Sequence, residues 1–193
     1  MLRALRQGLV RSASWLRTSK QFAVCRKGAT ALEFALVAAP FFALLIALFE
    51  TALVFFAGRV LDEVTEEASR YILTGQAQQS NMTQAQFDNY ICTSTNTAAL
   101  VSALFNCSKL MVSVENYADF ASANVSTPTL TFNANGTVSN AWTFSPGTPG
   151  SIVVLQVMYQ WPIVLGPLGF NLSNLANGNR LLVSTAVFKN EPY

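Results

Sequence analysis

The most prominent pattern in the sequence is an apolar run over residues 29–58, interrupted by Glu33, Pro40 and Glu50. A helix of this length, at about 1.5 Å per residue, is longer than the roughly 30 Å hydrocarbon layer of a membrane. The run therefore predicts a transmembrane helix. Its far end carries bulky side chains, whereas a secretory signal peptide ends in small residues at its cleavage site, so removal as an ordinary signal peptide is the less favoured alternative.

A second, amphipathic helical pattern follows without a break and ends at Thr74-Gly75, which is a helix stop signal. Apolar residues recur at steps of three and four and charged residues fill the opposite face, which predicts a helix lying on a core. The charged face is either solvated or a docking surface for a basic partner. The apolar positions are Val60, Leu61, Val64, Ala68, Tyr71 and Ile72, and the charged ones are Asp62, Glu63, Glu66, Glu67 and Arg70.

The rest of the chain alternates short structured segments with turns. β-branched and aromatic residues, separated by Asn-Gly and Pro-Gly pairs, predict strands. In order, we expect a polar linker over 76–82, a helical region over 83–105 broken near 93–96, strands over 110–117, 138–144, 152–161 and 181–189, and a loop over 162–179.

These segments predict an α+β fold in which a long N-terminal transmembrane helix extends into a small exported domain. We expect its antiparallel sheet to bury one face against the helix over 60–72. The predicted organisation is a basic leader over 1–28, the span over 29–58, the exported helix continuation over 59–75 and the α+β domain over 76–193. The apolar part of the last loop, 163–170, has three candidate destinations: the membrane surface, a neighbouring subunit or the sheet itself.

Charge orients the predicted span. The first 28 residues carry seven of the 12 Lys and Arg residues, and all ten acidic residues come later. The positive-inside rule then places the amino terminus in the cytoplasm and the bulk of the chain outside. Because the basic excess is confined to the leader, the slightly basic balance of +2 does not indicate nucleic-acid binding.

The junction between leader and span carries the candidate chemistry. Lys27 and Gly28 directly precede the apolar run, and Gly28 leaves an unhindered bond for a membrane protease. A carboxylate in hydrocarbon costs roughly 2.5 to 3.5 kcal/mol, so Glu33 should serve a purpose. Cleavage after Gly28 would create an ammonium group on Ala29, one helical turn from Glu33, and the carboxylate of one subunit could then neutralise the amine of its neighbour. The alternative is that Glu33 only snorkels to the interface.

The cysteines indicate the compartment. Cys25 lies in the leader, so cleavage would leave the exported part with Cys92 and Cys107. In an oxidising space this pair can form a disulfide, whose loop of about 15 residues contributes about 3 kcal/mol. The alternative is two reduced, buried thiols. The sequence contains no histidine, and two thiols alone make too few ligands for a closed zinc site, so we expect no metal and no cofactor.

The junction also resembles a known family. The segment Lys27-Gly28-Ala29-Thr30-Ala31-Leu32-Glu33-Phe34-Ala35-Leu36-Val37, its continuation through Phe49-Glu50-Thr51, and the ending Val187 to Tyr193 are similar to TadE-like proteins, which are pseudopilins of tight-adherence (Flp-type) pilus systems. This resemblance implies a pilin-like outline and a prepilin peptidase that cuts after Gly28, with Glu33 and Phe34 as the fifth and sixth mature residues.

The resemblance further implies partners and a location. The partners would be other pilins or pseudopilins, the pilus assembly machine and the lipid bilayer, and the protein would cross the bacterial inner membrane once with its domain in the periplasm. The exported domain is much larger than that of a Flp major pilin, which favours a minor or assembly component.

Two other function classes compete with this interpretation. The chain lacks a nucleophile elbow, a phosphate-binding glycine loop and a close acidic pair in the exported part, so no catalytic residue is predicted and an enzyme is not expected. A membrane-tethered binding or adhesion module outside any pilus is the alternative, and such a tether needs neither Gly28 nor Glu33.

Overall fold

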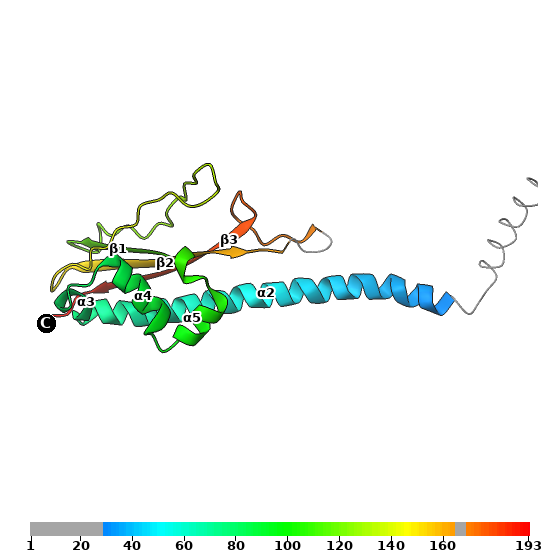
Figure 1. Ribbon diagram of the computed structural model, residues 1–193, viewed down its shortest axis with the longest axis horizontal. Helices are drawn as coiled ribbons and strands as arrows, with labels where there is room; N and C mark the ends of the chain where they lie inside the picture. The colour runs from blue at the N-terminus through cyan, green and yellow to red at the C-terminus, as the bar shows by residue number, and fades with distance from the viewer. Residues whose placement is uncertain (1–28, 165–168) are drawn as a thin grey trace, which may run out of the picture. The chain divides into compact units, whose positions relative to one another are not determined.

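The computed structural model describes residues 29–164 and 169–193. Helix α2 (Ala29–Leu73) is 45 residues long and continuous through Pro40 (Figure 1). The chain divides into two compact units with the boundary after Ala47, inside this helix. The second unit, Leu48–Tyr193, holds the rest of the helix together with the sheet.

Helix α2 ends at the predicted stop signal. The backbone N–H and the hydroxyl of Thr74 both donate to the carbonyl oxygen of Arg70, at 3.1 and 2.9 Å. Gly75 has a φ of 77°, a left-handed conformation that suits glycine, and its N–H donates to Ile72 at 2.9 Å. A Cβ at this position would overlap the ring of Tyr193, so Gly75 also permits the close approach of the chain end.

Short helices connect α2 to the sheet. The predicted polar linker contains one helical turn, and the predicted break in the next helical region lies between α4 and α5, as expected. A capping box between Thr83 and Gln86 starts α4, because each side chain bonds the backbone of the other residue. The elements are α3 (Gln76–Gln79), α4 (Gln84–Thr93), α5 (Ala98–Leu104) and the 3₁₀ helix η2 (Cys107–Lys109).

Three antiparallel strands form one sheet in the order β1-β2-β3. They are β1 (Met111–Tyr117), β2 (Ile152–Pro162) and β3 (Asn179–Lys189), which confirms three of the four predicted strands. In the observed register Val114 lies opposite Leu155, and Leu155 lies opposite Ala186.

The core lies between one face of the sheet and α2. The helix contributes buried residues at steps of three and four, and the sheet contributes every second residue of its strands. The predicted burial of the sheet against the helix over 60–72 is therefore confirmed. The helix residues are Val54, Ala57, Val60, Leu61, Val64, Ala68 and Ile72, and the strand residues include Val112, Val114, Val153, Leu155, Val157 and Phe188.

The strand predicted over 138–144 is wrong. Val138 makes one bridge to Phe132, and Phe144 makes one parallel bridge to Val114 at the free edge of β1. There the N–H of Val114 donates to the carbonyl of Thr143 at 2.8 Å. Residues with strand propensity form a strand only where a neighbouring strand provides a ladder of backbone hydrogen bonds. This segment pairs with the edge of β1 at one position.

The chain end is fixed to the end of α2. The N–H of Glu191 donates to the carbonyl of Leu73 at 3.0 Å. The side-chain amide of buried Asn190 donates to the carbonyl of Pro146 at 2.8 Å. The first bond holds the segment after β3 at the C-terminal end of the helix, and the second joins it to the β1–β2 connection at Pro146.

Candidate functional site

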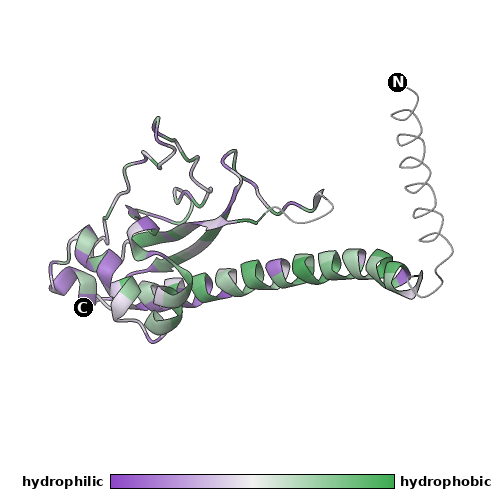
Figure 2. Ribbon diagram, turned by 45° about the vertical axis from the view of Figure 1, so that its right-hand side comes forward, coloured by the Kyte–Doolittle hydropathy of each residue, from purple (hydrophilic) through white to green (hydrophobic). Residues whose placement is uncertain are grey.

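The N-terminal part of α2 is mostly apolar, as the mainly green ribbon in Figure 2 shows, and many of its large apolar side chains are exposed. Within the described residues, Thr30–Leu73 is the one helix that is long and apolar enough to cross a membrane. Large exposed side chains of this kind are stable in lipid and costly in water. They are Leu32, Phe34, Leu36, Val37, Phe41, Phe42, Leu44, Ile46, Leu48, Phe49, Leu53, Phe55 and Phe56.

Glu33 lies on this apolar surface, one turn after the first described residue of α2. It is exposed, and Phe34 beside it is 71% exposed. In the part of the chain that is described, no ion pair involves Glu33. The carboxylate is therefore accessible to a charge from outside its own chain. Lys27 and Gly28, which belong to the same predicted motif, lie outside the described residues.

Glu50 differs from Glu33. Both of its carboxylate oxygens are buried, and neither has a hydrogen-bond partner among residues 29–164 and 169–193. It lies on the helix face that continues with Val54 and Ala57 toward the sheet. Both oxygens are thus covered by protein, although Glu50 lies within the helix that is apolar enough to cross a membrane.

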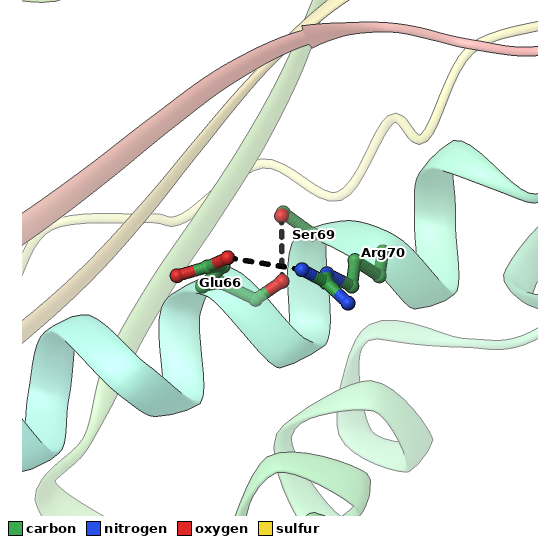
Figure 3. Close-up of polar contacts among 3 residues, drawn as sticks. All are labelled: Glu66, Ser69 and Arg70. Atoms are coloured by element: carbon green, nitrogen blue, oxygen red, sulfur yellow. Dashed lines mark hydrogen bonds and ion pairs between the residues drawn. The ribbon is translucent and has the colours of Figure 1, made fainter.

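The charged face of α2 beyond the apolar part is mainly solvated. Arg70 donates to Glu66 at 3.2 Å, and the hydroxyl of Ser69 donates to the carbonyl oxygen of Glu66 at 2.7 Å (Figure 3). The side chains of the ion pair are 75% and 66% exposed. Such a pair contributes about 0.3–0.5 kcal/mol. Its exposure favours the solvated interpretation of this face.

Glu67 is the exception on that face. Its two carboxylate oxygens accept the backbone N–H of Asn96 at 2.8 and 2.9 Å, and Oε1 also accepts the side-chain amide at 2.6 Å. The carboxylate thus fixes the turn between α4 and α5. The sequence alone does not reveal this role, because the two residues are 29 positions apart and no local pattern joins them.

The predicted disulfide is confirmed. Cys92 at the end of α4 is bonded to Cys107 in η2, with Cα atoms 6.1 Å apart. Cys92 is buried and belongs to the core. The bridge closes a loop of 15 residues around α5, for which the chain-entropy estimate is about 3 kcal/mol.

Asp88 on α4 is a half-buried carboxylate that no sequence motif marks. Its Oδ1 atom is buried and has no hydrogen-bond partner in the described ranges. Burial raises the pKa of Asp88 from 3.8 to about 6, because desolvation penalises the charged form. Asp88 is thus a charged group that weakens the fold at neutral pH.

We expect Asp88→Asn to stabilise the protein above pH 6. The folded pKa lies above the unfolded value, so the native state binds more protons between about pH 4 and 6 and loses stability as the pH rises through this window. A pKa difference of this size corresponds to at most about 3 kcal/mol, and partial solvation reduces the expected gain to about 1 kcal/mol. Urea unfolding of the full-length protein in detergent at several pH values measures it.

The matched control is Asp62→Asn, which changes an exposed carboxylate on α2. The free energy of unfolding of this variant should stay within about 0.5 kcal/mol of the wild-type value. If Asp88→Asn retained the decline in stability between pH 4 and 6, another group would be responsible for it.

No metal-binding constellation occurs in the described ranges, where His, Cys, Asp and Glu form no group of three or more. The polar features found there are instead an exposed carboxylate on an apolar helix and structural contacts within the domain.

No curated protein and no solved structure matches the chain. A family model does match residues 28–70, from the predicted cleavage site to the last turns of α2, and leaves the sheet outside. That family is a structural one associated with tight-adherence pili. The segment with the apolar anchor and Glu33, residues 28–70, is thus a match to the family described as TadE-like protein.

Proposed function

We propose that this protein is a pseudopilin, a minor pilin-like component required to assemble tight-adherence pili. The observation that carries the proposal is the position of Glu33. It is an exposed carboxylate on an otherwise apolar helix, inside the segment that matches the TadE-like family. A simple membrane tether gains nothing from such a charge, whereas a subunit that must align with its neighbours does.

In this proposal a prepilin peptidase cleaves the chain between Gly28 and Ala29. The new ammonium group then lies four residues, or about 6 Å along the helix axis, from the carboxylate of Glu33. In an assembly, the carboxylate of one subunit neutralises the amine of its neighbour. Lipid solvates neither charge, so this contact favours one axial register.

Before assembly, α2 crosses the bacterial inner membrane once, with the basic leader in the cytoplasm and the domain in the periplasm. The charge asymmetry of the sequence supports this orientation. The disulfide fits it as well, because disulfides persist in the oxidising periplasm. The partners are the peptidase, other pilins or pseudopilins and the assembly machine.

Intact-mass spectrometry of the protein from cells that contain the pilus peptidase tests the proposal. We expect a chain that lacks its first 28 residues and begins at Ala29. Gly28→Leu should leave the leader in place, because a Cβ and its branches obstruct the cleavage site. The matched control is Gly58→Leu, since a Cβ at Gly58 meets no atom within 4 Å.

The outcomes separate the candidate functions. An intact leader on the wild-type protein in these cells would contradict the pseudopilin and favour the tethered binding module. Cleavage of the Gly28→Leu variant at the same bond would show that the glycine is not what the peptidase recognises.

A further inference from the structure

A cavity of about 510 Å³ lies where the long β1–β2 connection meets one end of the sheet. Its walls come from η2, the start of β1, the end of β2, the start of β3, and residues 136–138 and Trp142 of the connection. In Figures 1 and 2 the connection loops over the side of the sheet that faces away from α2. The volume falls within the range of small-molecule sites, roughly 300–1,000 Å³.

The β1–β2 connection, residues 118–151, has the composition of a binding loop. Asp119 is its single charged residue, and Ser, Thr, Asn, Ala and Gly make up most of the rest. Its rings Phe120, Phe132 and Trp142 are all at least partly exposed. In binding loops, aromatic side chains supply rigid contact area while Ser, Gly and Asn supply adaptable hydrogen bonds.

Trp142 supplies an aromatic wall of the cavity. Tyr159, in the same wall, packs its ring against Phe105 at 5.0 Å between centroids. Among the described residues, the ring of Trp142 makes no such contact with another ring. The face of an indole ring is electron-rich and attracts the weakly positive C–H groups of a sugar ring. Trp142 is thus available to a ligand.

Amide side chains form a second wall. The Nδ2 group of Asn177 donates to Oε1 of Gln160 at 2.7 Å, and Oδ1 of Asn177 accepts the N–H of Asn179 at 3.2 Å. Nε2 of Gln160 and Oδ1 of Asn179 have no hydrogen bond within the described ranges. An apolar ligand would bury this donor and this acceptor without partners, which is costly, whereas hydroxyl groups satisfy both.

Lys109 supplies the charge. It is the only charged residue among the described residues that line the cavity, and it is exposed. Neither ion pair of the described residues includes it. The disulfide from Cys107 to Cys92 joins η2, and so the backbone of Lys109, to α4. An ammonium group in a wall without carboxylates favours an acidic ligand.

We propose that this cavity binds an acidic saccharide. The sugar ring lies on Trp142, and its hydroxyl groups bond Gln160 and Asn179. A carboxylate of the saccharide pairs with Lys109. The site belongs to the unit Leu48–Tyr193, which contains neither the leader nor Glu33, so failure of the site would leave the proposed pseudopilin function untouched. A pilus component with this site contacts a polysaccharide as well as other subunits.

Isothermal titration calorimetry of the full-length protein in detergent tests the site. The acidic probe is β-1,4-linked triglucuronate, and the neutral probe is cellotriose, which has hydroxymethyl groups in place of the carboxylates. We expect triglucuronate to bind about tenfold more tightly, because only its carboxylates use the charge of Lys109. Lys109→Gln should remove this preference. Trp142→Ala should weaken the binding of both probes by about tenfold, because both lose the aromatic face.

Two exposed residues outside the cavity serve as matched controls. Phe120→Ala removes an aromatic ring of the same connection, and Lys189→Gln removes a lysine of β3. Both variants should bind triglucuronate as the wild type does. Urea unfolding and the retained disulfide check that each variant is folded, and Lys109→Gln tests the site even if Trp142→Ala does not fold.

Three outcomes would overturn the proposal. The first is no detectable binding of triglucuronate at about 10 mM, which corresponds to an affinity too weak to serve recognition. The second is unchanged affinity in both cavity variants, which would place the saccharide elsewhere on the protein. The third is equal affinity for cellotriose, which would contradict an acidic ligand.

A parallel titration distinguishes two sources of such a saccharide. Its probe is a soluble cell-wall glycan of N-acetylglucosamine and N-acetylmuramic acid, whose carboxylates belong to the muramic acid. Tighter binding of this glycan than of triglucuronate would identify the wall of the cell itself as the source. Tighter binding of triglucuronate would identify an external polysaccharide, and either result supports the site.

Discussion

Replacing Glu33 by Gln should leave cleavage of the leader largely intact and reduce surface pili at least about tenfold, which corresponds to a loss of about 1.4 kcal/mol or more in assembly. The amide is nearly isosteric with the carboxylate, so helix α2 and its apolar surface are preserved. What the variant loses is the charge that can neutralise the amino terminus of a neighbouring subunit.

The expected effect is large because the environment of Glu33 is apolar. In water, an exposed ion pair contributes at most about 1 kcal/mol. Around Glu33 the exposed neighbours Leu32, Phe34 and Leu36 are apolar, so we expect a charge pair formed there in an assembly to be less hydrated than one on a water-exposed surface. An ammonium group left without its counterion there costs several kcal/mol.

Electron microscopy of cells and intact-mass spectrometry of the same cultures measure assembly and cleavage separately. Glu63→Gln is the matched control, because Glu63 is an exposed carboxylate of α2 beyond the apolar part. That control should retain both cleavage and pili. Full piliation with Glu33→Gln would refute the proposed pairing, and loss of cleavage would assign Glu33 to the peptidase site.

The sequence predicted those features whose causes are local. Helix α2 and the register of its buried face follow from steps of three and four, as at Leu61, Val64 and Ala68. The stop at Gly75 follows from the conformational freedom of glycine. Both the buried face of α2 and its end are determined by residues close together in the chain, so a single sequence is enough to predict them.

The features that the sequence missed depend on partners far away in the chain. The carboxylate of Glu67 bonds Asn96, 29 residues later. The burial of both carboxylate oxygens of Glu50 is likewise not evident from its neighbours in the sequence. The segment over 138–144 has strand propensity but meets β1 at a single bridge. Such contacts depend on the tertiary structure, which hydrophobic periodicity and strand propensity do not predict.

Phe144 shows what that segment does instead of forming a strand. Its ring lies 5.2 Å from the ring of Phe87 on α4, between centroids, and Phe87 lies 6.2 Å from Tyr90. Phe87 is 0% exposed and is the largest fully buried side chain in the described part of the chain. It therefore joins α4 to the long β1–β2 connection.

We expect Phe87→Ala to lower the free energy of unfolding by about 3–5 kcal/mol. The substitution removes a fully buried ring and leaves a cavity between α4 and the segment at Phe144. Natural domains are stable by only about 5–15 kcal/mol, so the variant should be close to unfolding at ambient temperature.

Urea unfolding of the full-length protein in detergent, followed by tryptophan fluorescence, measures this loss. Phe120→Ala is the matched control, because Phe120 belongs to the same β1–β2 connection and is 60% exposed. That variant should lose less than about 0.5 kcal/mol, as exposed substitutions do. Equal losses for the two variants would mean that the ring of Phe87 is not part of the core, and the packing of α4 against the connection would then need another explanation.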